Sequence, residues 1–223
     1  MQILQGKRLV KADAETFRSL REGYPSCLID IGTGDGLFPY RHAREHPDCL
    51  TIGIDPVTDA LKKLAVKAQR KITKGGAPNL LLIQSSLEEL PGLLAGSATA
   101  LTVNFPWGGL LRALVEPAPK LLKNLAAVGA PGAAVTLLIN VSIFGDEDYL
   151  RRQALPSFAE DRVQEDLVPV YRECGIELTE IQALAGAVPH RTSWGQRLVR
   201  GSARRSLLLR GYTSSPATGP IPA

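Results

Sequence analysis

A run of alternating glycines that begins with an acid is the part of the chain whose residue types best suit chemistry. The run Asp30-Ile31-Gly32-Thr33-Gly34-Asp35-Gly36 follows apolar residues and leads into a helix-like segment that begins at Leu37. Glycines let the chain turn tightly after a strand and let a ligand approach main-chain N–H groups. The spacing differs from the G-x-G-x-x-G fingerprint of dinucleotide-binding folds. We therefore expect a nucleotide-type cofactor here, with the Asp30 carboxylate facing a cationic part of it.

Two further acids follow the next predicted strands. Asp55 lies about 20 residues beyond the glycine loop, where an acid commonly hydrogen-bonds ribose hydroxyls. Leu87 and Glu88 follow the strand after that, where an adenine ring would lie, although Glu88 could also belong to a solvated helix turn. Because the carboxyl ends of parallel strands meet at one sheet edge, we expect these acids in one pocket. An acid-x-G-x-G-x-G loop with such acids is typical of methyltransferases that use S-adenosylmethionine.

The elements that position these residues alternate between strands and helices, which predicts an α/β fold with helices on both faces of a parallel sheet. The predicted strands are 27–31, 51–54, 80–83, 100–103, 133–139, 177–181 and 206–210. The predicted helices are 13–21, capped by Asp13, then 58–74, 110–128 and 161–174. Seven strands fit the Rossmann-like class I methyltransferase sheet, whose last strand is antiparallel.

The chain of 223 residues fits a single domain over residues 1–212. We expect a small β extension within residues 1–12 and a disordered tail over 213–223. Two loops are longer than a crossover needs: 141–160 after the fifth strand, and 183–205 between the sixth and seventh. Long loops in compact domains are usually functional or disordered, and both lie at the substrate edge.

Composition narrows the class of protein. The chain is 44% hydrophobic and 22% charged, as in ordinary globular proteins. It has no apolar run of the ~20 residues that span a bilayer and no hydrophobic signal core at its N-terminus. Its cysteines are isolated, and His42 and His46 lack an acid partner on their helix. We expect a cytoplasmic monomer with no bound metal, with Cys27 in the core and both histidines at the surface.

Positive charge is concentrated in two segments of a chain whose net charge is +4. The first, 58–74, has Asp59 as its one acid, and the second, 191–210, has none. On a single helix, one face of the first segment would carry Lys63, Lys67, Arg70, Lys71 and Lys74. One lysine-rich helix is usually a solvated face, but two unneutralised clusters predict a polyanionic partner.

Two tryptophans lie in segments that could receive a planar substrate. Trp107 belongs to Asn104-Phe105-Pro106-Trp107-Gly108, which follows the fourth strand and resembles, with changes, the Asn-Pro-Pro-aromatic motif of amine methyltransferases. Trp194 ends Thr192-Ser193-Trp194 in the second long loop. Brought over one cofactor, the two rings would form a slot for a flat base; the alternative is that each packs in the core. Stacking contributes ~1–3 kcal/mol per base, against the few kcal/mol needed to extrude a base.

The combination of these motifs resembles one family. The glycine loop, the 104–108 segment and Thr192-Ser193-Trp194 followed by Arg197-Leu198 are similar to aminoglycoside-resistance 16S rRNA methyltransferases of the kanamycin–apramycin type, which modify N1 of adenosine 1408. The segment 74–81 is also similar, and the resemblance runs from about Gly6 to Tyr212. It implies a class I fold, S-adenosylmethionine as cofactor and the small ribosomal subunit, with its 16S rRNA, as partner.

The resemblance also implies roles for individual positions. S-adenosylmethionine would be held by Asp30, Gly32, Thr33, Gly34, Asp55, Pro56, Leu87, Glu88, Asn104, Thr192 and Ser193. Trp107 and Trp194 would enclose the flipped adenine as the catalytic pair. Phosphates of rRNA would be bound by Lys67, Arg70, Lys71 and Arg204.

The expected chemistry agrees with the residue types. N1 of adenine carries an in-plane lone pair, so the reaction needs positioning rather than a general base or a protein nucleophile. The alternatives are a methyltransferase of the same fold acting on tRNA guanine or a small molecule, and a ribosome-binding protein without turnover. An NAD-type dehydrogenase is disfavoured by the glycine spacing.

Overall fold

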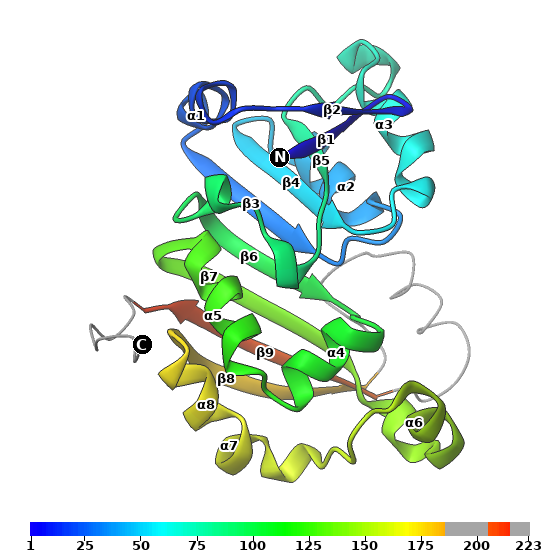
Figure 1. The fold of residues 1–223 in the computed structure, drawn as a ribbon, viewed down its shortest axis with the longest axis vertical. Helices are drawn as coiled ribbons and strands as arrows, with labels where there is room; N and C mark the ends of the chain where they lie inside the picture. Colours follow the sequence, from blue (N-terminus) through cyan, green and yellow to red (C-terminus); the bar gives the residue numbers. More distant parts are fainter. Residues whose placement is uncertain (186–204, 215–223) are drawn as a thin grey trace.

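The protein is built on one mixed sheet. The structure, a computed structural model, describes residues 1–185 and 205–214. Within that part the sheet has nine strands in the order β2-β1-β5-β4-β3-β6-β7-β9-β8 (Figure 1). The strands are β1 (Gln2–Gln5), β2 (Arg8–Lys11), β3 (Ser26–Ile31), β4 (Cys49–Asp55), β5 (Leu80–Gln84), β6 (Ala98–Asn104), β7 (Gly129–Asn140), β8 (Ile176–Ala185) and β9 (Arg205–Thr213). The seven predicted strands are β3 to β9, and the β1–β2 hairpin adds two more.

Strand directions agree with the predicted class. Strands β5, β4, β3, β6 and β7 are parallel neighbours. Strand β9 lies antiparallel between β7 and β8, which confirms the antiparallel last strand. The inner strands read as continuous apolar runs because helices cover both faces, and Ile29 and Ile52 are fully buried.

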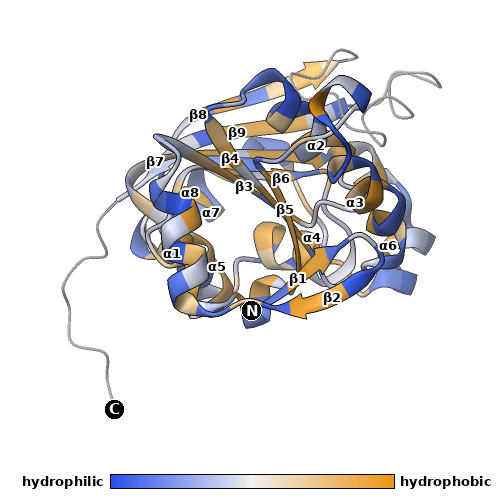
Figure 2. Cartoon of the chain, turned by 90° about the horizontal axis from the view of Figure 1, so that it is seen from above, coloured by the Kyte–Doolittle hydropathy of each residue, from blue (hydrophilic) through white to orange (hydrophobic). Residues whose placement is uncertain are grey.

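Two groups of helices cover the two faces (Figure 2). The helices are α1 (Ala14–Glu22), α2 (Leu37–Glu45), α3 (Lys62–Ala68), α4 (Gly108–Val115), α5 (Pro119–Val128), α6 (Glu147–Gln153), α7 (Val163–Asp166) and α8 (Val168–Glu173). The larger apolar core joins the sheet to α1, α5 and α8, and the smaller one joins it to α2 and α3. Asp13 caps α1 as predicted, because its Oδ1 accepts the Thr16 N–H at 2.8 Å.

Three predicted helices are shorter than the sequence indicated. The predicted helix 110–128 is two helices, because prolines 117 and 119 interrupt it and Pro119 starts α5. The predicted helix 161–174 is a short 3-10 turn followed by α7 and α8. The predicted helix 58–74 is helical only over α3, between the 3-10 turns Asp59–Leu61 and Ile72–Lys74. The basic residues therefore do not share one helix face.

Four smaller predictions concern Cys27, the histidines His42 and His46, the C-terminal tail and membrane-spanning segments. Cys27 is fully buried, and burial raises the pKa of its thiol to about 12. His42 is half-buried with Nδ1 3.0 Å from Thr51 Oγ1, so the surface assignment was wrong for it, whereas His46 is exposed. Thr213 is buried in β9, and residues 215–223 of the predicted tail lie outside the described residues. In the described ranges, no helix is both long and apolar enough to cross a membrane.

Candidate cofactor and target-base site

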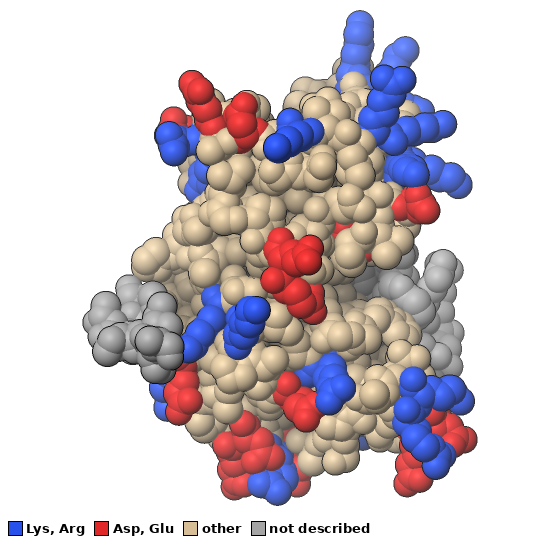
Figure 3. All heavy atoms as spheres, viewed as in Figure 1, with Lys and Arg blue, Asp and Glu red and all other residues tan. Residues whose placement is uncertain are grey.

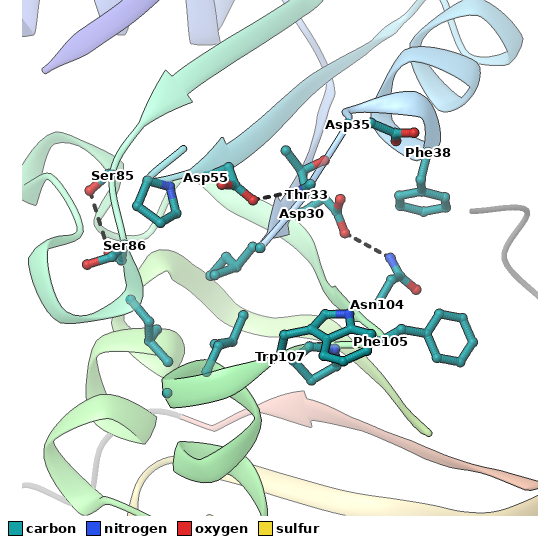
Figure 4. A pocket seen from close by; sticks show the side chains of 18 of the residues that line it. Asp30, Thr33, Asp35, Phe38, Asp55, Ser85, Ser86, Asn104, Phe105 and Trp107 are labelled. Atoms are coloured by element: carbon teal, nitrogen blue, oxygen red, sulfur yellow. Dashed lines mark hydrogen bonds between the residues drawn. The ribbon is translucent and has the colours of Figure 1, made fainter. Parts of the chain in front are cut away.

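A cavity of about 360 Å³ opens at the carboxyl edge of β3, β4, β5 and β6. Ten predicted site residues line it: Asp30, Gly32, Thr33, Gly34, Asp55, Pro56, Leu87, Glu88, Asn104 and Trp107. In Figure 4, Ser85 and Ser86 lie at one end, Asp55 and Asp30 come next, and Asn104 and Trp107 lie toward the other. The cavity is therefore elongated, with polar groups spaced along it.

Asp30 is the buried acid of the site, with only 1% of its surface exposed. Its Oδ1 accepts hydrogen bonds from Thr102 Oγ1 at 2.7 Å and from Asn104 Nδ2 at 2.8 Å. Thr102 is its register partner on β6, so strand pairing itself supplies this donor. Burial raises the pKa of Asp30 to about 6, although the nearby polar side chains of Thr33, Thr102 and Asn104 act in the opposite direction. A buried carboxylate of this kind gains most from a cationic ligand group.

Asp55 ends β4 and shapes the glycine loop. Its Oδ2 accepts the Gly34 N–H at 2.8 Å (Figure 4), and its Oδ1 accepts the Val57 N–H at 2.9 Å. Each carboxylate oxygen can accept a further bond. Asp55 therefore fixes the loop and still has acceptor capacity facing the cavity.

The glycine loop provides space more than hydrogen-bond donors. Gly32 has φ +71°, and a Cβ there would lie 2.5 Å from Leu110 Cδ2, so a side chain would be excluded. The N–H groups of Gly32 and Thr33 donate to the Ile54 carbonyl, and that of Gly36 donates to the Thr33 carbonyl. The expectation that a ligand uses these N–H groups was wrong, since strand β4 and the loop already use them. A phosphate would find no cradle of these N–H groups, whereas a cofactor without phosphates needs none.

Other groups that line the cavity were not predicted. Asp35, Phe38, Ser85, Ser86, Phe105, Pro106, Gly109 and Leu110 do so. The two serines directly follow β5, so the carboxyl-edge rule could have found them. The hydroxyl of Thr33 is buried and has no hydrogen-bond partner in the described part of the chain. A bound group could therefore satisfy this hydroxyl.

The segment after β6 presents Trp107 to the cavity mouth. Phe105 has φ +51°, an uncommon backbone conformation for a non-glycine residue. Its ring is buried against Leu138 and Leu208, and its N–H donates to the Leu138 carbonyl at 2.7 Å. The indole of Trp107, by contrast, is 43% exposed. This segment therefore anchors one aromatic ring in the core and leaves the other partly exposed at the cavity.

Tyr149 of α6 packs edge-on against Trp107, with ring centroids 6.2 Å apart. This contact places part of the long loop after β7 beside the cavity. The Tyr149 hydroxyl is buried and has no hydrogen-bond partner among the described residues, and burial raises the pKa of Tyr149.

Replacing Tyr149 with phenylalanine is expected to keep or raise the free energy of unfolding, by about 1 kcal/mol, because a buried unpaired hydroxyl is removed. Urea denaturation would measure it. Tyr149→Ala is the matched variant, and it should lose stability because the ring packs against the larger apolar core. A destabilised Tyr149→Phe would show that the hydroxyl has a partner.

The basic residues differ in how they are neutralised. Among the described residues, ion pairs link Arg205 to Glu160 at 3.3 Å and Arg210 to Glu180 at 3.0 Å. The sequence expectation of an unneutralised second cluster was therefore wrong for these two arginines. No described acid pairs with the exposed Lys63, Lys67, Arg70, Lys71 or Lys74. Figure 3 shows Lys and Arg side chains gathered over α3 and its neighbourhood.

Four predicted site residues, Thr192, Ser193, Trp194 and Arg204, lie outside the described residues. The structure brings the rest of the cofactor set and Trp107 together at the cavity. Lys67, Arg70 and Lys71 lie apart from it, on and just after α3. In the described ranges, no group of three or more His, Cys, Asp or Glu could hold a metal ion.

The strand order, the antiparallel β9 and the cavity at the carboxyl edge define a class I methyltransferase domain. Residues 2–213 match the family model described as NpmA: 16S rRNA (adenine(1408)-N(1))-methyltransferase. The chain belongs to this family.

Individual relatives agree with this assignment. A protein from Streptoalloteichus hindustanus, named 16S rRNA (adenine(1408)-N(1))-methyltransferase, is 34% identical over 206 residues, which are 89% of this chain and 92% of the relative. A variant of the enzyme of that name from Catenulisporales acidiphilia, crystallised with cosubstrate SAM, is 33% identical with a TM-score of 0.86, covering 99% of this chain and 100% of that one. The aminoglycoside resistance methyltransferase NpmB1 is 34% identical with a TM-score of 0.82, covering 94% and 98%.

Proposed function

We propose that this protein transfers a methyl group from S-adenosylmethionine to N1 of adenosine 1408 in the 16S rRNA of the small ribosomal subunit. The observation that carries this is the cavity: a buried acid, a second acid and an exposed tryptophan lie along one elongated space, in a chain of this family. Modification of the decoding site would confer resistance to kanamycin- and apramycin-type aminoglycosides. A ribosomal target implies a cytoplasmic protein, which we propose acts as a monomer without metal.

The residues present fit the cofactor. Asp30 would hold its cationic methionine end, Asp55 and Pro56 its ribose, and Leu87 and Glu88 its adenine. Asn104 would hold Asp30 in place through the 2.8 Å hydrogen bond, and Thr33 would offer its buried hydroxyl. When bound, S-adenosylmethionine supplies an already activated methyl group. The protein's own part is then to orient that group and exclude water.

For the target base, we propose that Trp107 and Trp194 stack on the flipped adenine with Thr192 and Ser193 closing the pocket. N1 needs no general base once it is unpaired, so stacking and alignment are sufficient. The cationic product would lie near Asp30, which could ease the developing charge. Lys67, Arg70, Lys71 and Arg204 would bind rRNA phosphates. Residues 1–212 would act as one domain.

Purified small subunits incubated with the protein and S-adenosylmethionine test this function directly. A methyl group on N1 blocks Watson–Crick pairing, so reverse transcription should stop at adenosine 1408 only when the protein is present. Omission of S-adenosylmethionine is the control. Tight cofactor binding without a stop would reject this target, and would favour another RNA, a small-molecule acceptor or a ribosome-binding role without turnover.

Charge reversal of Lys67 and Lys71 to glutamate is expected to weaken binding to small subunits at least about tenfold, because contacts to phosphates would become repulsive. Binding of S-adenosylmethionine, measured by calorimetry, should not change, since neither residue lines the cavity. Because Lys67 Nζ also lies 4.7 Å from the Tyr40 ring centroid, Lys67→Arg serves as a control that retains this contact. Equal loss of cofactor and ribosome binding would show that these lysines are structural.

A further inference from the structure

The amino-terminal hairpin carries positive charge that the proposed site does not use. Residues 1–12 contain Lys7, Arg8 and Lys11 and no aspartate or glutamate. All three side chains belong to exposed residues. In the part of the chain that the structure describes, none of them pairs with an acid. These charges are available to a partner.

The turn of the hairpin packs directly against α3. Gly6 has φ +60°, and a Cβ placed there would lie 3.1 Å from Gln69 Oε1 and 3.9 Å from Val66 Cγ2. Leu4 of β1 is buried in the same apolar cluster as Ala65 and Ala68 of α3. The hairpin is thus held against the end of α3 by packing of β1 and of the turn itself. Lys7 and Arg8 directly follow Gly6 in the sequence, so the turn brings them close to this end of α3.

The hairpin turn and α3 also share one side of the molecule. Figures 1 and 2 both show them on the side to which β3 and β6 point, which is the side of the cavity. In Figure 3 the Lys and Arg side chains over α3 and the hairpin turn form one group. The two sources of charge are far apart in the sequence and adjacent in the fold.

We propose that Lys7 and Arg8 bind rRNA phosphates and extend the surface formed by Lys67, Arg70 and Lys71. This inference rests on the proposed function. A cluster of exposed donors without acids suits a polyanion with regularly spaced charges. Phosphate contacts position a protein without specifying sequence, so the hairpin would add affinity and orientation while the choice of base remains with the cavity.

The test compares two double variants with the same change in charge. Lys7→Glu with Arg8→Glu alters the hairpin, and Lys120→Glu with Lys123→Glu alters exposed lysines of α5. Affinity for small subunits is measured over a range of salt concentrations. The hairpin variant should bind at least about tenfold more weakly than the α5 variant at low salt. Its log–log salt slope should fall by roughly 1.4–1.8, because two phosphate contacts are lost and each removes roughly 0.7–0.9.

Controls separate this inference from the function on which it rests. Binding of S-adenosylmethionine should be unchanged in both variants, and any remaining reverse-transcription stop should stay at adenosine 1408. Lys7→Gln with Arg8→Gln should lower the salt slope by the same amount without introducing repulsion. Equal affinities for the hairpin and α5 variants would overturn the inference. Weaker binding with an unchanged salt slope would also overturn it and indicate that the hairpin acts through its packing rather than its charge. If the wild-type protein gave no stop, the proposed function itself would fail.

Discussion

Replacement of Asp30 with asparagine is expected to weaken S-adenosylmethionine binding at least about 30-fold while making the free protein more stable. The loss follows because the cationic end of the cofactor would face a neutral group in a buried site, where an unpaired charge costs about 2–5 kcal/mol. The gain follows because Asp30 is 1% exposed and carries its charge at neutral pH at a cost. Asparagine keeps an oxygen that can accept from Thr102 and Asn104, so the packing need not change.

The raised pKa of Asp30 determines how the difference in stability between wild type and Asp30→Asn changes with pH. Burial raises the pKa of Asp30 to about 6, so the folded protein holds the proton more tightly than the unfolded chain. That stabilisation is complete below about pH 4 and is lost as pH rises through about 6. Wild type and Asp30→Asn should therefore be similarly stable in acid and diverge toward pH 8, by an amount on the order of 3 kcal/mol.

Cofactor affinity should show the opposite dependence. Below about pH 6 the wild-type carboxyl must release its proton before it can pair with a cation, so wild-type affinity should fall by up to about tenfold per pH unit. The asparagine variant should show no such fall. Calorimetry from pH 5 to 8, with urea denaturation of the same samples, measures both quantities. A variant that binds normally yet fails to methylate would instead assign Asp30 a role in the reaction step.

The residues of the cofactor half of the cavity could be predicted from the sequence because their positions follow from strand pairing. Asp30 and Asp55 end neighbouring parallel strands, and strand pairing brings them to one edge whatever the rest of the chain does. The use of the loop N–H groups could not be anticipated, because it depends on how closely the loop approaches Ile54 and Asp55. The same residues can form a phosphate cradle or a closed turn, and only the backbone distinguishes them.

Contacts between residues that are distant in the sequence account for most of the remaining differences between the predicted and the observed structure. The sequence interpretation placed 58–74 on one basic helix. The chain leaves the helix after Ala68, and Gly76 then packs against the Arg70 carbonyl, which a Cβ on Gly76 would approach to 1.7 Å. The acid that neutralises Arg205 is distant in the sequence, at Glu160. The contact between Tyr149 and Trp107 joins two separate loops. No local pattern encodes contacts of this kind.

Replacement of Trp107 with alanine is expected to lower kcat/KM for methylation of small subunits by about 5- to 150-fold, the effect of losing ~1–3 kcal/mol of stacking on one base. The indole is 43% exposed, so the free energy of unfolding should change little. Trp107→Phe keeps an aromatic face and should retain most of the activity. The stop at adenosine 1408, followed over time at limiting enzyme, reports the rate.

The neighbouring ring provides the control that separates stacking from folding. Phe105 is 4% exposed and packs against Leu138 and Leu208, so Phe105→Ala should cost about 3–5 kcal/mol of stability. If Trp107→Ala loses activity while remaining as stable as wild type, the indole acts on the target base. If it loses stability in proportion to activity, as Phe105→Ala should, Trp107 is a packing residue and the base must be held elsewhere. Binding of S-adenosylmethionine in the same variant decides whether any residual effect comes through the cofactor, because Trp107 also lines the cavity.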